Sequence, residues 1–158
     1  MFNLRNRRRR GFSLIELLIV IAIILIIITI AVPKFQKTQI FAREMAAIKA
    51  IQTVHQMEVQ YQSQYGRYAT SLAELGPPAS GGPSPAAADL IGNDLAQGVK
   101  GGYKYAVTAT QGGYIITATP MSYGNDGNRS FYSDQSMVIR ENYGAEPATA
   151  SSKEMGVK

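Results

Sequence analysis

Residues 12–32 read FSLIELLIVIAIILIIITIAV, and this apolar stretch decides how the chain of 158 residues can fold. Its only polar members are Ser13, Glu16 and Thr29. As an α-helix the stretch would be about 31 Å long, roughly the thickness of the hydrocarbon core of a bilayer. Length and composition therefore predict a membrane-spanning helix close to the N-terminus.

Five arginines precede this stretch and indicate its orientation. The chain has 16 basic and 11 acidic residues, so its formal net charge is +5, and the five arginines account for the whole excess. They are Arg5, Arg7, Arg8, Arg9 and Arg10. Basic residues beside an apolar span favour the cytoplasmic side, which places the chain after residue 32 across the membrane. A nucleic-acid partner is not expected, because it would need Lys and Arg spread over a folded face.

Two simpler interpretations of the N-terminus compete with this one. A secretory signal peptide would end in small residues, which 29–31 match loosely, but the apolar stretch is too long and contains a carboxylate. An uncleaved signal anchor fits the length equally well. It would hold a periplasmic module that never polymerises.

Glu16 distinguishes these interpretations. A carboxylate inside an apolar span costs about 2.5 to 3.5 kcal/mol at the helix centre, and less near an end, so it generally has a partner. Cleavage between Gly11 and Phe12 would create an α-amine four residues before Glu16. With an ordinary pKa of about 7.7 to 8.0, this amine can stay charged and pair with Glu16 of a neighbouring subunit.

The sequence RGFSLIEL at residues 10–17 resembles the cleavage and methylation motif of type IV pilins and type II secretion pseudopilins. The resemblance implies that a prepilin peptidase cuts after Gly11, that Phe12 becomes the N-methylated first residue, and that Glu16 acts in assembly. The implied partners are other copies of the chain in a helical homopolymer, the peptidase, and an inner-membrane platform with its ATPase. The precursor is expected in the bacterial inner membrane with a cytoplasmic N-terminus, and the product in an extracellular or periplasmic filament.

Pro33 closes the apolar stretch and matches a proline that is common in this family. A proline removes one helical hydrogen bond and clashes with the preceding turn, so it predicts a kink or a loosened turn. The alternative is that the membrane helix ends there.

Residues 33–66 are expected to form the amphipathic half of the same helix. Eight apolar or aromatic residues recur there at an average spacing of about 3.4. They are Phe41, Met45, Ile48, Ile51, Val54, Met57, Tyr61 and Tyr65. The polar face contains Lys49, Gln52, Gln56 and Gln60. Gly66 is expected to end the helix, and His55, the only histidine, to lie on the surface.

Residues 67–101 are expected to be a loop with short helical turns. Ser71 and Glu74 have the spacing of a capping box, and residues 76–88 form a stretch of Pro, Gly, Ser and Ala that suits a surface loop. The sequences at 65–68 and 71–75 also resemble the segment after the long helix of major pseudopilins.

Alternating residues at 102–140 predict an antiparallel sheet. One hairpin pairs 103–110 with 114–119 and ends at Pro120, and a shorter one pairs 130–133 with 137–140. The fold class is therefore α+β, with the long N-terminal helix packed on a small antiparallel sheet of about four strands. Residues 141–158 have little apolar pattern and are expected to be a flexible tail.

No metal or catalytic centre stands out. The chain lacks cysteine, which excludes disulfides and Cys-based zinc sites, and no spacing of Ser, His or acidic residues indicates an enzyme. Asp126, Asn128 and Asp134 offer some of the oxygen ligands that calcium needs. They resemble the calcium loop of major pseudopilins, but NRSF at 128–131 replaces its acidic stretch, so a simple turn is the alternative.

These observations divide the chain into a cytoplasmic leader (1–11), a transmembrane and filament-core helix (12–32), its amphipathic half (33–66), a loop (67–101), a sheet (102–140) and a tail (141–158). The leading hypothesis is a structural subunit of a type IV pilus-like filament. A major pseudopilin of type II secretion is the alternative within the family. The altered calcium loop argues against it.

Overall fold

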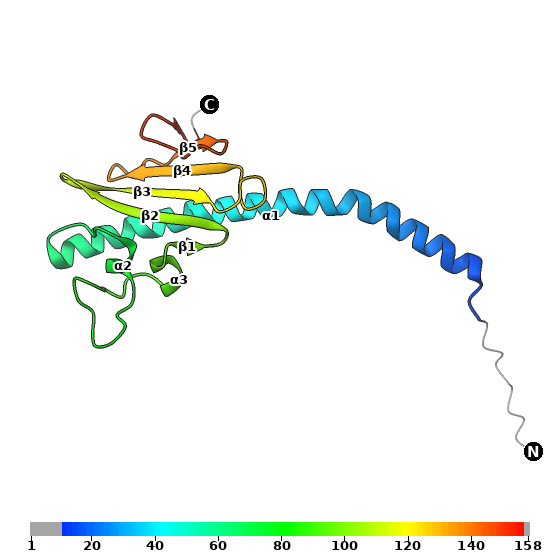
Figure 1. The fold of residues 1–158 in the computed structure, drawn as a ribbon, viewed down its shortest axis with the longest axis horizontal. Coiled ribbons are helices and arrows are strands. Elements are labelled where there is room, and N and C mark those ends of the chain that lie inside the picture. The colour runs from blue at the N-terminus through cyan, green and yellow to red at the C-terminus, as the bar shows by residue number, and fades with distance from the viewer. Residues whose placement is uncertain (1–10, 157–158) are drawn as a thin grey trace, which may run out of the picture. The chain divides into compact units, whose positions relative to one another are not determined.

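The computed structural model describes residues 11–156, so the predicted leader lies outside the described residues except for Gly11. One long helix, α1 (Leu14–Tyr65), begins just after the cleavage motif and contains Pro33 (Figure 1). The alternative that Pro33 ends the helix is therefore wrong. The contacts divide the chain into two compact units at Lys37 and Thr38, which are described separately below.

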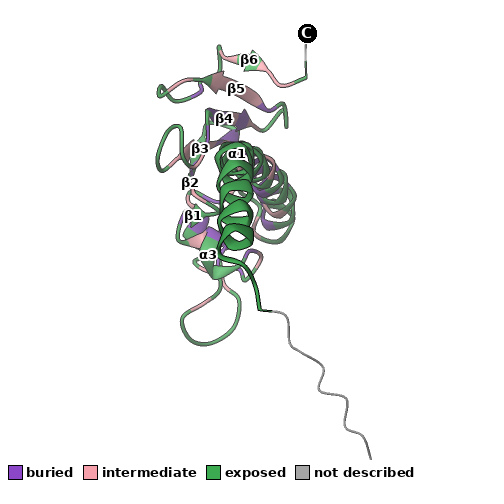
Figure 2. Ribbon diagram, turned by 90° about the vertical axis from the view of Figure 1, so that its right-hand side faces the viewer, coloured by how far each residue is buried: buried purple, intermediate pink, exposed green. Residues whose placement is uncertain are grey.

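In the first unit, α1 is entirely exposed, and as far as Val32 it is apolar on all sides. Every described residue up to Gln39 is exposed, and Figure 2 shows this part of the helix in green. The Thr29 hydroxyl donates to the carbonyl of Ile26 at 2.7 Å, so this polar side chain is satisfied within the helix itself. A helix that is apolar on every side is typical of a membrane span or of a core formed with other chains.

In the second unit, α1 is amphipathic as predicted. Lys49 and the three glutamines that follow are exposed, whereas a continuous side of the helix is buried. Its buried residues are Glu44, Ala47, Ile48, Ala50, Ile51, Val54, His55, Glu58 and Tyr61. The buried stripe begins at Glu44 rather than at Phe41, whose side chain is 58% exposed.

The chain between α1 and the sheet contains two single-turn helices, α2 (Leu72–Leu75) and α3 (Asn93–Ala96). Gly66 follows α1 with a φ of +73°, the left-handed conformation that glycine adopts easily at a helix end, as expected. The predicted capping box is wrong, because the Ser71 side chain makes no capping hydrogen bond. Glu74 instead accepts from the backbone N–H of Thr70 at 2.9 Å.

Within the described residues the sheet has six antiparallel strands in sequential order rather than about four. They are β1 (Val99–Lys100), β2 (Tyr103–Thr110), β3 (Gly113–Pro120), β4 (Arg129–Asp134), β5 (Arg140–Tyr143) and β6 (Lys153–Glu154). The additional strands, β1 and β6, have two residues each, too few to produce an alternating pattern. The first hairpin is confirmed, with Thr110 opposite Gly113 and Pro120 at the end of β3.

Two predictions about the C-terminal part are wrong. The strand expected at 137–140 begins only at Arg140, because Met137 has a φ of +62° in a longer turn. The tail expected to be flexible contains regular structure in its described part, residues 141–156: β5 pairs with β6, Ala148 is buried, and Arg140 forms an ion pair with Glu154 at 2.9 Å. Polar contacts hold this segment, so an apolar pattern did not reveal it.

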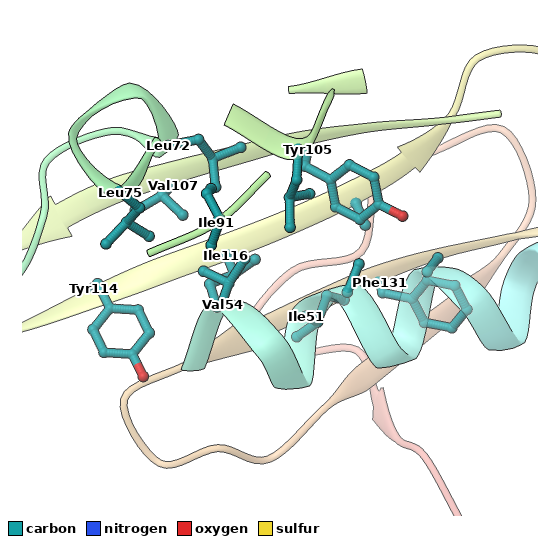
Figure 3. Close-up of a cluster of buried hydrophobic side chains, with 14 of the residues drawn as sticks. Ile51, Val54, Leu72, Leu75, Ile91, Tyr105, Val107, Tyr114, Ile116 and Phe131 are labelled. Atoms are coloured by element: carbon teal, nitrogen blue, oxygen red, sulfur yellow. The ribbon is translucent and has the colours of Figure 1, made fainter. Parts of the chain in front are cut away.

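The core lies between the second part of α1 and one face of the sheet. Figure 3 shows Ile51 and Val54 of α1 among side chains of α2 and the sheet. The buried partners include Leu72, Leu75, Ile91, Tyr105, Val107, Tyr114, Ile116 and Phe131. Alternate residues of β2 are buried, as its alternating sequence predicts. This α+β arrangement confirms the predicted fold class.

Candidate functional site

The predicted processing site lies at the start of α1. Phe12 is 85% exposed, and a Cβ placed on Gly11 would meet no atom within 4 Å. Packing within the described chain therefore gives no reason for glycine at position 11. The role of Gly11 in cleavage stays a prediction.

Ser13 and Glu16 together cap the helix. The Ser13 carbonyl accepts from the N–H of Leu17 at 3.2 Å, and the Glu16 carboxylate accepts from the N–H of Ser13 at 3.4 Å. This is one half of a capping box, in which a glutamate at the third helical position bonds back to the residue before the helix. The spacing Ser13-x-x-Glu16 is that of a capping box and could have predicted this role. Glu16 was predicted to act only in assembly.

The helix that follows offers a large apolar surface. Within the described residues, α1 is the one helix that is long and apolar enough to cross a membrane, with a mean hydropathy of 3.3 over 18 residues, none of them buried. Soluble monomers rarely expose apolar patches larger than a few hundred Å². A surface of this kind is typical of helices that lipid or other protein chains cover.

The predicted calcium residues are not gathered at one point. Asp126 precedes β4 and forms an ion pair with Arg43, whereas Asp134 ends β4 and accepts from the N–H of Ser136 at 2.9 Å. A strand of six residues is roughly 17 Å long, so these two carboxylates do not reach one ion. Among residues 11–156, no group of three or more His, Cys, Asp or Glu is placed to hold a metal. Calcium binding by the loop alone stays a prediction.

Asn128 and Arg129 instead belong to an ionic network that fixes α1 to the sheet. The backbone N–H of Asn128 donates to Glu44 at 2.8 Å, and the buried Arg129 side chain binds Glu44 at 2.7 Å and Glu141 at 2.8 Å. The Arg129 guanidinium also lies 5.5 Å from the ring centroid of Phe131. This network joins α1, β4 and β5, and the sequence analysis missed it because its members are far apart in sequence.

His55 is buried, so its predicted surface position is wrong. Its side chain is 4% exposed, and its two ring nitrogens lie 2.7 Å from the hydroxyls of Tyr114 and Ser133. These residues belong to α1, β3 and β4. Polar partners on two strands allow the histidine to be buried at low cost.

A membrane-type helix that begins with this motif and continues into an α+β domain is the arrangement that the sequence resemblance implies. The family described as the prokaryotic N-terminal methylation motif matches residues 6–32. The chain is also 38% identical over 71 residues to the type IV major pilin protein PilA of Myxococcus xanthus (strain DK1622). The N-terminal motif and part of the chain are thus similar to proteins of the type IV pilin kind.

The similarity to this relative is partial. It covers 45% of the chain described here and 32% of the relative, so the chain matches about a third of that protein's length. This match alone therefore does not assign the function of the whole relative to this chain.

Proposed function

We propose that this chain is a structural, non-catalytic subunit of a type IV pilus-like filament. The observation that carries the proposal is the fully exposed apolar part of α1, which begins immediately after the Gly11–Phe12 bond and has Glu16 in its first turn. A membrane covers this surface in the precursor, and the same part of neighbouring subunits covers it in the filament. The name of the similar protein, a major pilin, favours a pilus over a secretion pseudopilin.

Processing would supply the partner for Glu16. A prepilin peptidase hydrolyses the Gly11–Phe12 peptide bond with water and transfers a methyl group from a separate methyl donor to the released amine of Phe12, which gives up a proton. In the single chain, Glu16 accepts one long hydrogen bond, at 3.4 Å, from the neutral N–H of Ser13. Hydrogen bonds between charged groups are shorter and roughly twice as strong, so the cationic amine of a neighbouring subunit is a better partner.

Because the precursor is anchored in the membrane, assembly needs further partners. The precursor is anchored in the inner membrane with its N-terminus in the cytoplasm, and the unit from Thr38 lies on the opposite side. Extraction of an apolar helix from lipid requires work, which an inner-membrane platform and a cytoplasmic ATPase would supply.

The experiment that tests processing is mass spectrometry of the protein purified from cells. The proposal predicts a mature chain that begins at N-methylated Phe12. An intact arginine leader on the cellular protein contradicts it, and indicates a signal-anchored module that does not polymerise.

Substitution of Glu16 tests assembly. We expect Glu16→Ala to lower filament yield by at least about tenfold, because the apolar helix can still enter the membrane but the amine loses its partner. Gln52→Ala, an exposed change on the same helix, is the matched control and should assemble normally. The location of the filaments separates the remaining alternatives: long surface fibres indicate a pilus, and short periplasmic filaments tied to protein export indicate a pseudopilin.

A further inference from the structure

Two titratable side chains of α1 are buried on the face that packs against the rest of the second unit. His55 is 4% exposed and Glu58 is not exposed at all. His55 contacts Tyr114 of β3 and Ser133 of β4, whereas Glu58 contacts the chain that follows α1. The filament role uses neither side chain. Their burial therefore needs an explanation of its own.

The hydrogen bonds indicate which ring nitrogen of His55 carries a proton. The Ser133 hydroxyl donates to the carbonyl of Val138 at 2.9 Å, so its oxygen must accept from an Nε2–H of His55. The other ring nitrogen, Nδ1, is then free to accept from the hydroxyl of Tyr114. The neutral ring of His55 is thus fully paired. Burial lowers its pKa, although the nearby Asp134 carboxylate partly opposes that shift.

Glu58, in contrast, is incompletely paired. Its Oε2 accepts from the backbone N–H of Ala69 at 2.9 Å, whereas its buried Oε1 has no hydrogen-bond partner among the described residues. A buried carboxylate with one unpaired oxygen is far more costly as an anion than as a neutral acid. Burial therefore raises the pKa of Glu58 to about 7, an effect that the Ala69 N–H opposes.

The charged and titratable groups around Glu58 come from each neighbouring element. Glu74 of α2 raises its pKa and Arg67 of the preceding loop lowers it. On α1, His55 is neutral, and on β3 the carboxylate interacts with the Tyr114 hydroxyl. Asp134 of β4 acts on His55. Arg67 is thus the one cation among them, and it already binds Glu74 at 2.8 Å.

Two carboxylates hold the same short segment of chain, residues 67–70. Glu58 holds the buried Ala69, and Glu74 holds Arg67 and Thr70. Although burial opposes it, hydrogen bonds from Arg67 and Thr70 lower the pKa of Glu74 to about 2, so Glu74 stays ionised near neutral pH. One of the two attachments is thus constant, and the other changes with pH.

We propose that Glu58 acts as a pH-dependent attachment between α1 and residues 67–70, tight when its carboxyl is protonated and loosened when the carboxyl ionises and draws in water. The inference concerns the second unit alone and does not depend on filament assembly. If the proposed function also holds, this unit faces the exterior, where the cell does not buffer the pH. Acidic surroundings would then strengthen the end of α1 against the loop that follows it.

Hydrogen exchange at the Ala69 amide tests the proposal on the full chain in detergent micelles. The ionised fraction of Glu58 rises from about a tenth at about pH 6 to about nine-tenths at about pH 8. We expect the protection factor of this amide, corrected for the intrinsic exchange rate, to fall by about tenfold over that range.

Two variants make this measurement specific. Glu58→Gln retains an acceptor for the Ala69 N–H and cannot ionise, so its protection factor should change by less than about twofold. Glu74→Gln removes the ion pair with Arg67 and should retain the pH-dependent fall. The proposal is overturned by a flat profile in the wild type, or by an equal fall in Glu58→Gln and the wild type.

Direct titration provides a second readout that does not depend on local opening. In NMR spectra of the full chain with labelled glutamate carboxyl carbons, one resonance should titrate near pH 7 and disappear in Glu58→Gln. Titration of the Glu58 carboxyl near its ordinary value of 4.5 contradicts the proposal.

Discussion

Residues 14–37 and 38–65 of α1 belong to one continuous helix, but their apolar side chains are covered in different ways. In the second part, the sheet and α2 of the same chain bury one face, and a polar face remains for solvent. In the first part, every described residue is exposed, and residues 14–32 have no polar face. Folding of the single chain thus covers the apolar face of the second part. The apolar surface of the first part is left for lipid or for other chains to cover.

The largest predicted effect on stability concerns the ionic network around Arg129. This network lies near the start of residues 38–65, the half of α1 that the rest of the chain covers. Replacing Arg129 by methionine leaves the buried Glu44 and the partly buried Glu141 without their cation. We expect a loss of about 3 to 5 kcal/mol in the free energy of unfolding, measured by denaturant titration of the full chain in micelles. Arg43→Met is the control. It removes a more exposed pair with Asp126 and should cost about 0 to 1 kcal/mol.

A matched pair of substitutions tests whether the two halves of α1 differ in how their apolar side chains are covered. Ile51 is fully buried and Ile23 is exposed, although both belong to α1. Ile51→Ala should destabilise the second unit by about 2 to 5 kcal/mol, because it leaves a cavity in the core. Ile23→Ala should change the same free energy by less than about 0.5 kcal/mol. Equal losses in the two variants would show that the two halves of the helix are not covered differently.

The pH dependence of unfolding provides a finer test within the covered half. The raised pKa of Glu58 means that the folded state holds an additional proton, so its contribution is complete below about pH 4.5 and is lost as the pH rises through about 7. This contribution amounts to about 3 kcal/mol. The lowered pKa of His55 acts in the opposite direction, since its contribution is present above pH 6.5 and is lost on acidification.

Single variants separate these opposing contributions. His55→Gln should become more stable as the pH falls from about 7 to about 5, and Glu58→Gln should become less stable over the same range. Thermal melting as a function of pH measures both. Parallel profiles for the two variants would contradict the assigned protonation states.

The smallest expected effect concerns calcium. Because the Arg43 guanidinium already pairs with Asp126, we expect about 1 mM calcium to shift the melting temperature by less than about 1 °C relative to EDTA. A rise of several degrees, lost in Asp126→Asn, would establish that the loop before β4 binds the ion.

The sequence predicted the uncovered half better than the covered half. The apolar stretch, Gly11, Phe12 and Glu16 form a local pattern, so the predicted helix and its relation to a known motif followed from adjacent residues. The amphipathic spacing and the first hairpin were likewise local and are confirmed.

What the sequence did not reveal depends on contacts between distant residues. His55 is buried because Tyr114 and Ser133 satisfy its ring, and residues 141–156 are ordered largely through polar contacts such as that of Arg140 with Glu154. The predicted calcium set failed to converge because the length of β4 separates Asp126 from Asp134. Spacing along the chain contains no information about such pairings.

The most direct test asks what covers the apolar half of α1 in purified filaments, where no membrane is present. The chain has no cysteine, so Leu25→Cys and Gln52→Cys each introduce a single thiol, and both positions are exposed in the single chain. Our account predicts that a water-soluble maleimide labels Gln52→Cys in filaments but labels Leu25→Cys only after dissociation. Equal labelling of the two thiols in intact filaments would contradict it.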